Sequence, residues 1–527
     1  MNNHAVKTGE LEVLSLDVPY VADPTELYSA VCQNRPNSLL LESAEIDSKQ
    51  DIKSFMLIDA AVRIVCYGRH VKLEAKTGNG RNLLAAVEHR IESQRLSIET
   101  TLTPDTLEMH FPRTTSALDE DARLREHSQF DALRLVQESC ELAGHPDDAI
   151  MIGGLFAYDL VAEFEPLPVA NATNNCPDYV FYVAETLLVI DHQRRKGRLQ
   201  GTLFGGDDTA ESYFDLSRRL QAIKESCLNP VQLPAAVILE QCEPQVSVSD
   251  TDFCAAVETM RDYVVKGDVF QVVPSRRFTL PCPSPLNAYR KLKQGNPSPY
   301  MFYMHDEVFT LFGASPESAL KYSKESNQVE IYPIAGTRPR GKNGDGSINL
   351  DLDGRIELEL RNDTKEKAEH MMLVDLARND VARISEPGSR YVADLLKVDR
   401  YSHVMHLVSR VVGQLRSDLD ALHAYQACMN MGTLTGAPKI RAMQLIRDFE
   451  KQKRGSYGGA VGYLNGHGDM DTCIVIRSAY VENDIAQVQA GAGVVFDSVP
   501  QAEADETRGK AQAVITAIQA AHRKEPA

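Results

Sequence analysis

The sequence predicts an α+β fold in a chain large enough for more than one structural unit. Three observations predict this class: a length of 527 residues, a soluble composition with 43% hydrophobic and 25% charged residues, and strand-like and helix-like segments without regular βαβ alternation. At roughly 150 residues per domain, this length corresponds to about two to four units or to one large two-lobed body. No uncharged apolar stretch reaches the roughly 18 residues of a membrane helix, which excludes a membrane span.

Charge and cysteine usage narrow the possible partners. Fifty-six basic and 74 acidic side chains give a net charge of -18, which repels nucleic-acid phosphates and anionic lipid. The ten cysteines form no CxxC pair and no Cys/His cluster at zinc spacing, so structural zinc and disulfides are disfavoured. Residues 1–16 lack the basic region and apolar core of a secretory signal, and we therefore expect a cytoplasmic protein.

A proline-containing stretch over 227–250 separates a half that is poor in chemical motifs from a half that is rich in them. We therefore predict an N-terminal α+β region over 1–230, a linker over 231–249 and a C-terminal region over 250–527. Hydrophobic patterning predicts the following elements in chain order. They are strands 38–41 and 57–66, helices 83–95 and 130–142, strand 179–190, a helix 252–266 capped by Asp250 or Thr251, and strands 269–274 and 310–312.

Two predicted helices of the C-terminal region carry paired carboxylates. Glu366 and Glu369 lie three residues apart on one helix, and Glu503 and Glu506 lie three residues apart on another, followed by Lys510. Residues at this spacing share a helix face. Oxygen ligands from two separate helices, completed by a substrate anion and water, are typical of Mg²⁺ sites.

A purely structural interpretation of both helices stays open. Asp363 with Glu366, and Ser498 with Gln501, have the spacing of capping boxes. Glu369 with Lys365, and Glu506 with Lys510, could form salt bridges on solvated helix faces.

Four glycine-containing turns lie between these elements, over 334–340, 430–439, 455–459 and 490–493. Glycine allows backbone N–H groups to converge on an anion, so a carboxylate-binding site is reasonable. None of the turns is a Walker A loop or a dinucleotide fingerprint, which disfavours ATP and NAD. Arg477 lies in the apolar, strand-like run 473–478, where it fits either an ion pair at the edge of the core or a bidentate carboxylate clamp.

Together these motifs resemble the chorismate-utilising enzymes. The resemblance rests on PIAGTRPR at 333–340, LVDLARND at 373–380, GTLTGAPK at 432–439 and AGAG at 490–493, followed by the second carboxylate helix. It covers about 250–521 and implies a fold of two β-sheets packed face to face with helices outside. Within the family, the chain is most similar to members that add ammonia to chorismate and release pyruvate with Mg²⁺, the first committed step of tryptophan biosynthesis.

Two positions favour amination at ring position C2. Family members that add water carry a lysine in place of Gln271, and members that aminate the opposite ring position carry a lysine in place of Ala335. Alternative functions are a 2-amino-2-deoxyisochorismate synthase, which stops before pyruvate is lost, and a non-catalytic sensor of an aromatic anion.

The resemblance implies a role for each matching residue. Glu317 is the general acid, although by sequence alone it fits a helix entry after Pro316. His406 lines the ring pocket, and only the family alignment separates it from His403. The implied sets are Glu317, His406, Gln271 and Thr433 for catalysis; Gly336, Thr337, Tyr457, Arg477, Gly491, Gly493 and Lys510 for substrate; and Glu369 and Glu506, with Glu366 and Glu503 through water, for Mg²⁺.

The N-terminal half carries LLES at 40–43, which is similar to the family's tryptophan-binding element, and 296–302 resembles the other wall of that site. The resemblance implies feedback inhibition, although both segments would also fit a buried core. The implied inhibitor-binding residues are Leu41, Glu42, Ser43, Pro299, Tyr300, Met301 and Cys473.

A partner is expected because the chain lacks a glutamine-hydrolysing nucleophile. The segment around Cys66 comes closest to a G-x-C-x-G turn, but Ile64 stands where glycine is needed, so we expect Cys66 in a buried strand. The resemblance implies a separate glutamine amidotransferase small subunit that passes ammonia to the Gln271 side of the pocket.

Overall fold

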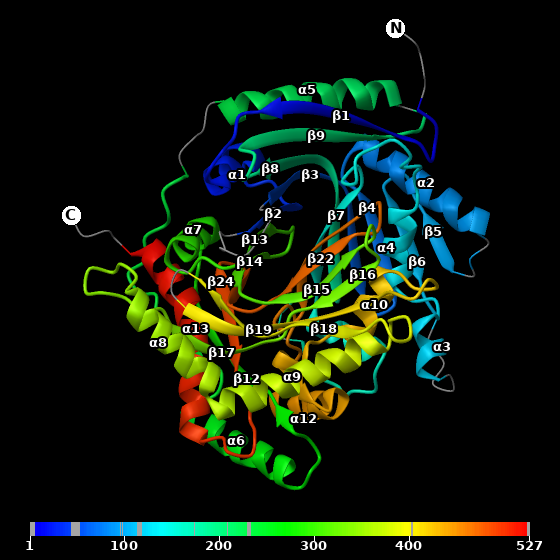
Figure 1. Cartoon of the computed structure of the whole chain (residues 1–527). Coiled ribbons are helices and arrows are strands. Elements are labelled where there is room, and N and C mark those ends of the chain that lie inside the picture. The colour runs from blue at the N-terminus through cyan, green and yellow to red at the C-terminus, as the bar shows by residue number, and fades with distance from the viewer. Residues whose placement is uncertain are drawn as a thin grey trace.

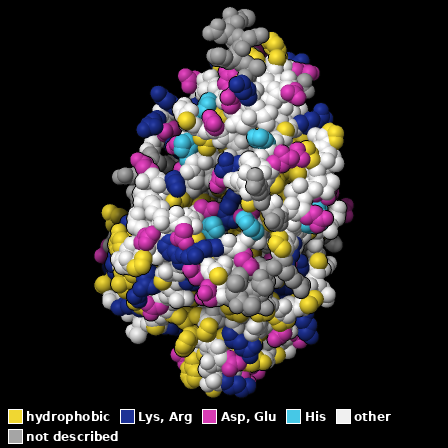
Figure 2. Space-filling view, turned by 90° about the vertical axis from the view of Figure 1, so that its right-hand side faces the viewer, with side chains coloured by type: hydrophobic (Ala, Val, Ile, Leu, Met, Phe, Trp, Pro, Cys, Tyr) yellow, Lys and Arg dark blue, Asp and Glu magenta, His cyan; other side chains and the backbone are white. Residues whose placement is uncertain are grey.

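The computed structural model describes residues 6–43, 53–94, 96, 98–112, 119–172, 174–207, 209–228, 233–401 and 404–523. Its strands form one continuous antiparallel hydrogen-bonded system, which divides at the shared strands β3 and β8 into two large sheets, and its helices lie on the outside (Figure 1). The long helix α5 covers β1 and β9, whereas α9 lies beyond β18 and β19 at the opposite side of the molecule. On the face seen in Figure 2, acidic and basic side chains are interspersed and several histidines are visible.

The first sheet pairs strands from both halves of the chain. Its order is β1 (Leu11–Val18), β9 (Lys196–Phe204), β8 (Tyr179–Asp191), β3 (Lys53–Tyr67), β2 (Ser38–Glu42), β13 (Tyr300–His305), β14 (Thr310–Ser315), β23 (Ser478–Glu482), β24 (Ile485–Gly491), β12 (Ser275–Pro281) and β10 (Gln245–Val246).

The second sheet starts at the edge strand β5 and uses the other ends of β3 and β8. Its order is β5 (Glu99–Leu102), β6 (Thr106–His110), β4 (His70–Ala75), β3, β8, β7 (Met151–Phe156), β21 (Ala460–Asn465), β22 (Met470–Ile474), β15 (Ser318–Ser323), β16 (Gln328–Ile331) and β19 (Val404–Gln414), with β17 (Ile334–Pro339) and β18 (Tyr391–Arg400) also paired to β19. A separate two-stranded ladder joins β11 (Gln271–Val272) to β20 (Gly436–Ala437).

Strands β3 and β8 belong to both sheets. The register between them shifts several times from Leu57 to Val62, and such bulges bend a strand and increase its twist. On one side of the shifts β8 pairs with β9, and on the other side it pairs with β7. The predicted boundary near residue 230 therefore does not separate the sheets: β2 pairs with β13, and β7 pairs with β21. Residues 229–232 lie outside the described ranges, and the domain division stays a prediction.

The hydrophobic core has the layers expected of two sheets packed face to face with helices outside. One cluster, which includes Leu39, Tyr182, Phe302 and Val461, consists almost entirely of strand residues and lies between the two sheets. Two larger clusters join the outer faces of the sheets to helices. The predicted α+β class, with two sheets packed face to face and helices outside, is confirmed.

The helices are distributed over both outer faces. They are α1 (Pro24–Cys32), α2 (Gly78–Gln94), α3 (Glu120–Leu124), α4 (Phe130–Gln137), α5 (Thr209–Leu228), α6 (Asp250–Val265), α7 (Pro285–Gly295), α8 (Leu350–Asn362), α9 (Thr364–Ala382), α10 (Ala421–Cys428), α11 (Gly432–Thr435), α12 (Lys439–Glu450) and α13 (Pro500–His522), with a 3₁₀ turn at Tyr158–Glu163. None of the described helices is long and apolar enough to cross a bilayer. None of the ten cysteines, all of which lie among the described residues, forms a disulfide.

The helix starts differ in part from the prediction. Asp363 caps α9 through the Glu366 N–H, as predicted, but Ser249 rather than Asp250 or Thr251 caps α6. Ser498 does not cap α13, because its hydroxyl accepts a bond from the Val495 N–H. That helix instead starts with Pro500, whose fixed φ suits the first turn.

Candidate active site

A cavity of about 500 Å³ gathers every residue predicted for catalysis, substrate binding and metal binding. The lining residues come from elements far apart in the chain, among them β17, α9, β19, α11, β24 and α13. The carboxylate helices and the four glycine turns therefore meet at one place, which the sequence spacing alone did not require.

The two carboxylate helices bring Glu366 and Glu369 of α9 and Glu503 and Glu506 of α13 to this cavity. The Glu506–Lys510 salt bridge considered for α13 is present, with Oε1 and Nζ 2.5 Å apart. Glu369 forms no salt bridge with Lys365; its Oε1 instead accepts a long hydrogen bond of 3.5 Å from the Gln271 Nε2.

The pKa of Glu369 is raised by burial and by the negative charges of Glu366 and Glu506. Burial, together with Glu506, also raises the pKa of Glu503, although the nearby Ser498 hydroxyl opposes that shift. A cation in this cavity would therefore relieve the repulsion between the carboxylates and restore their charge.

The donor set fits Mg²⁺ better than an ion that needs a cage of protein ligands. Within the described ranges, no three of these carboxylates bring their ligand atoms within 4.8 Å of one another. Mg²⁺ is commonly held by one or two carboxylates and completed by water and substrate oxygens, which the two facing helices can provide.

Glu317 is the most perturbed carboxyl group in the cavity. Its side chain is almost fully buried, and burial raises its pKa to about 8, while Thr433, Lys510 and Arg477 oppose the shift. Glu317 immediately precedes strand β15, and its carbonyl accepts a hydrogen bond from the Ile474 N–H at 3.0 Å. The helix entry that fitted this residue by sequence is therefore wrong. At neutral pH Glu317 is predominantly protonated and can donate a proton.

His406 is held as a neutral imidazole. Burial and the nearby Arg477 lower its pKa to about 4, and its Nδ1 lies 2.9 Å from the Thr337 hydroxyl. The Tyr401 ring packs 5.3 Å away, centroid to centroid. A neutral imidazole can accept a proton but cannot act as an acid at neutral pH. The alternative residue, His403, lies outside the described residues.

The sequence context of Arg477 predicted a continuous strand over 473–478, but the structure does not place Arg477 in a strand. It follows the end of β22, with a left-handed φ of 49°, and β23 begins at the next residue. Burial lowers its pKa, and among the described residues its guanidinium has no salt-bridge partner within 4.0 Å. A half-buried guanidinium without a carboxylate partner among the described residues is a strong site for a ligand carboxylate.

The glycine turn at 490–493 holds the backbone against other lining residues. A Cβ at Gly491 would lie 2.7 Å from the Pro274 carbonyl oxygen, and one at Gly493 would lie 2.4 Å from the Gln271 Nε2. The Lys510 ammonium donates to the Gly491 carbonyl at 3.0 Å, which fixes it beside the turn. Side chains at these glycines would displace Gln271 or narrow the cavity.

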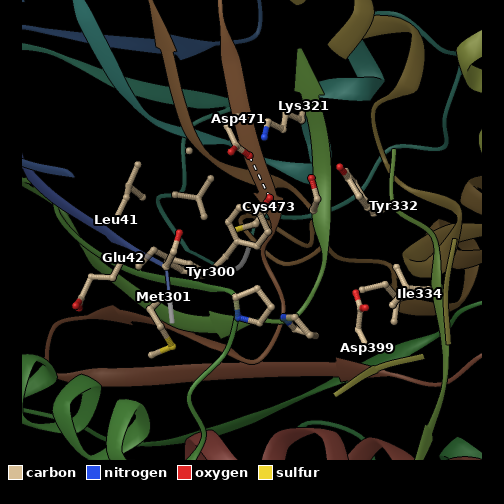
Figure 3. A pocket seen from close by; sticks show the side chains of 18 of the residues that line it. Leu41, Glu42, Tyr300, Met301, Lys321, Tyr332, Ile334, Asp399, Asp471 and Cys473 are labelled. Atoms are coloured by element: carbon tan, nitrogen blue, oxygen red, sulfur yellow. Dashed lines mark hydrogen bonds between the residues drawn. The ribbon is translucent and has the colours of Figure 1, made fainter. Parts of the chain in front are cut away.

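A second cavity, of about 510 Å³, is lined by all seven residues predicted to bind an inhibitor. Strands β2 and β13 pair so that Glu42 is opposite Met301, and β22 contributes Cys473 (Figure 3). The Glu42 carboxylate accepts 2.5 Å bonds from Tyr289 and Lys293 of α7. Because α7 already satisfies this carboxylate, Glu42 shapes the cavity mainly through its backbone.

The two cavities share a wall. Pro316 and Ile334 line both of them, whereas Glu317 lines only the first and Ser318 lines only the second. Sequence reasoning missed this wall and the polar lining of the second cavity, such as Lys321, Tyr332 and Asp471. Asp471 could have been found, because it lies two residues before Cys473 on one strand and thus on the same face.

Comparisons with known proteins show the family of the chain. Residues 96–516 match the model of the chorismate binding enzyme family. The chain is 68% identical to anthranilate synthase component 1 of Vibrio parahaemolyticus, over 98% of this chain and 94% of the relative. It is 57% identical to the Escherichia coli protein of the same name, over 97% and 98% of the two chains. The crystal structure of anthranilate synthase component I from Streptococcus pneumoniae superposes with a TM-score of 0.66 at 30% identity, covering 90% of this chain and 94% of that one.

Proposed function

The chain belongs to the chorismate binding enzyme family, and from this premise we propose that it converts chorismate and ammonia to anthranilate and pyruvate, as an anthranilate synthase component I. The observation that carries the proposal is the pairing of two groups in one cavity. Glu317 is a buried acid that is protonated at neutral pH, and Gln271 is an uncharged amide where a water-adding enzyme needs a base. This combination suits loss of a hydroxyl and attack by ammonia, which is already nucleophilic.

Substrate binding is assigned to the cationic side of the cavity. Chorismate carries two carboxylates, and Arg477 and Lys510 are cationic residues of the cavity lining, with Lys510 beside the glycine turn and Arg477 close enough to Tyr457 to influence it electrostatically. Glu369 and Glu506 would hold Mg²⁺ directly, with Glu366 and Glu503 acting through water. Bound Mg²⁺ would neutralise the ring carboxylate and act as a Lewis acid.

The chemical steps are assigned to three side chains. Glu317 donates its proton to the 4-hydroxyl as the C–O bond breaks, and water leaves. Ammonia forms the new bond at C2, where the Gln271 Oε1, a buried acceptor without a hydrogen-bond partner among the described residues, can accept one of its N–H groups. The added ammonium group returns one proton to the Glu317 carboxylate. Neutral His406 then takes the C2 proton while the C3–O bond breaks. The departing enolpyruvate takes up that proton at its methylene carbon to become pyruvate, and the ring is left aromatic.

A separate glutamine amidotransferase subunit would supply the ammonia. Cys66 is fully buried in β3, as predicted, and burial raises the pKa of its thiol well above the ordinary value. A buried, protonated thiol is a poor nucleophile for glutamine. The chain alone should therefore use ammonium salts but not glutamine.

Feedback inhibition by tryptophan is assigned to the second cavity. A ligand that fills it presses on Pro316 and Ser318, the two residues that flank Glu317 in the chain. Even a small displacement there would move the acid relative to the substrate, because a packed wall transmits movement. Inhibition follows if tryptophan binds best to the form that binds chorismate poorly.

One assay tests the proposed reaction. The purified chain, chorismate, Mg²⁺ and ammonium at alkaline pH should give equal amounts of fluorescent anthranilate and pyruvate. EDTA, or Glu369→Gln or Glu506→Gln, should abolish most turnover. An aminated product without pyruvate would identify a 2-amino-2-deoxyisochorismate synthase, and binding without turnover would identify a sensor. Glutamine-dependent activity of the chain alone would contradict the division of labour with a partner.

A further inference from the structure

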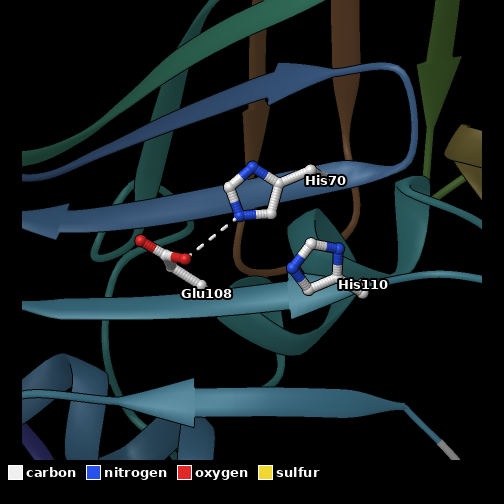
Figure 4. Close-up of side chains that lie close together, drawn as sticks. All are labelled: His70, Glu108 and His110. Carbon is white, nitrogen blue, oxygen red and sulfur yellow. Dashed lines mark hydrogen bonds and ion pairs between the residues drawn. The ribbon is translucent and has the colours of Figure 1, made fainter.

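A cluster of two histidines and one glutamate lies at the end of the second sheet, away from both cavities. His70 is on β4, and Glu108 and His110 are on β6 (Figure 4). None of the three lines either cavity described above. Within the described residues, it is the one group of three possible metal-ligating side chains whose ligand atoms all lie within 4.8 Å of one another.

The strand register creates this cluster. His70 is directly opposite His110 in the antiparallel ladder, and Glu108 lies two residues from His110 on the same strand face. Leu107 and Met109 alternate with them and are buried, so the three polar side chains share the outer face of the sheet. The sequence predicted no Cys/His site of this kind, because His70 and Glu108 are 38 residues apart.

The three side chains already face one another. The His70 Nε2 lies 3.3 Å from the Glu108 Oε2, and the two imidazole rings stack with their centroids 4.4 Å apart. Lys72 is opposite Glu108 in the ladder, but its ammonium pairs with Glu74 at 3.0 Å. Lys72 therefore does not neutralise the Glu108 carboxylate, which contacts His70 instead.

The donor chemistry indicates a metal of the zinc type. Two imidazole nitrogens and one carboxylate oxygen are the ligands of many zinc sites that keep a position open for water. Ligand atoms of a tetrahedral zinc site are about 3.4 Å apart, which follows from metal–ligand distances of about 2.0–2.2 Å. The His70 and Glu108 side chains are each 36% exposed, so small rotamer changes can bring the ligands to this spacing.

We propose that His70, Glu108 and His110 bind a divalent transition-metal ion such as Zn²⁺, held by two imidazole nitrogens and one carboxylate oxygen. The site differs in chemistry from the catalytic cavity, where all predicted metal ligands are oxygens. A bound ion would link β4 to β6 across the ladder and would stabilise the folded chain by mass action. The proposal does not depend on the proposed reaction.

A zinc titration of the tag-free full chain tests the proposal. After removal of metals, Zn²⁺ is added at about pH 7.5, where imidazoles are mostly neutral, against a chromophoric chelator and in the presence of excess Mg²⁺. We expect one zinc site. His70→Ala, His110→Ala and Glu108→Gln should each weaken it at least about tenfold, since loss of mere outer-shell partners already costs about 10- to 100-fold. His89→Ala, an exposed histidine of α2, is the matched control and should leave binding unchanged.

Two further measurements make the result decisive. Zn²⁺ should raise the Tm of the unaltered chain and of His89→Ala but not that of His110→Ala, while the Tm values in EDTA show whether each variant folds. Co²⁺ bound to the unaltered chain should show the absorption of imidazole ligation. Equal zinc affinity in the unaltered chain and the His70→Ala/His110→Ala double variant would overturn the proposal. So would a Co²⁺ spectrum without nitrogen ligands, or zinc binding that is lost in Glu369→Gln.

Discussion

The catalytic cavity and the second cavity have nearly equal volumes, about 500 and 510 Å³, but different parts of the fold build them. The first takes its carboxylates from α9 and α13 and its arginine from a left-handed residue between two strands. The second is lined mainly by residues of paired strands, including β2, β13 and β22. Helices and loops bring charges together and shift their pKa values, whereas a rigid ladder provides shape. One fold can thus place the proposed active site and the proposed inhibitor site on opposite sides of one wall.

Replacing one buried glutamate in each cavity gives the largest expected contrast. Glu317 and Glu42 are similarly buried, at 6% and 7% exposure, but Glu42 is bound to Lys293 and Tyr289. Glu317→Gln should lower kcat about 10²- to 10⁴-fold by removing the general acid. Glu42→Gln should change kcat less than about tenfold. Steady-state assays with ammonium, together with chorismate binding, check both; an unchanged kcat in Glu317→Gln would refute the acid assignment.

The pH dependence sharpens the same contrast. Because burial raises the pKa of Glu317 to about 8, its proton is present below that pH and is lost above it. At a constant concentration of neutral ammonia, kcat/KM for chorismate should fall about tenfold per pH unit above about 8. Glu317→Gln should lack this decline in its residual activity. A decline that persists unchanged in the variant would assign it to another group.

Ser43→Phe should alter regulation with little effect on turnover. Ser43 lines the second cavity at the end of β2, and a phenyl group there would occupy the volume that tryptophan needs. We expect kcat to stay within about threefold of that of the unaltered chain, which corresponds to a change of less than about 1 kcal/mol in activation free energy. Sensitivity to tryptophan should be lost. Ser93→Phe, on the exposed side of α2, is the control. Inhibition of Ser43→Phe with unaltered affinity would place the inhibitor site elsewhere.

The smallest effect concerns stability. The pKa of Glu317 in the folded chain is about 8, above the ordinary 4.5. Ionising this carboxyl group therefore costs more free energy in the folded chain than in the unfolded chain. The unaltered chain should lose stability as pH rises from about 4.5 to 8, by a few kcal/mol at most. Glu317→Gln lacks this loss and should have a Tm higher by about one to a few degrees at pH 8. Thermal unfolding in EDTA at both pH values checks the difference.

Local patterns in the sequence predicted the parts of the site that depend on spacing along one element. The i,i+3 glutamates of α9 and α13 lie on the predicted faces, because helix geometry fixes which residues share a face. The context of Arg477 failed as a guide, since an apolar run does not reveal that one residue turns left-handed and ends a strand. Ser498 failed as a cap because Pro500 supplied the helix start.

Such local patterns did not predict the contacts between segments that are distant in the sequence. Assigning Glu317 and Ser318 to the two sides of one wall requires the pairing of β15 with β22. The cluster of His70, Glu108 and His110 likewise depends on the β4–β6 register. Neither register follows from hydrophobic alternation, which fixes the face of a residue but not its partner.

The pairing of strands from the first half of the chain with strands from the second half has a consequence for protein synthesis. When the first 230 residues have left the ribosome, β2 still lacks β13 and β7 still lacks β21. Two open, largely apolar strand edges are then exposed until the second half of the chain has been translated. The long sequence separation of these pairs slows folding, so nascent chains need protection from aggregation during elongation. For the same reason, a gene split near codon 230 would yield two fragments with unfinished sheets rather than two independent proteins.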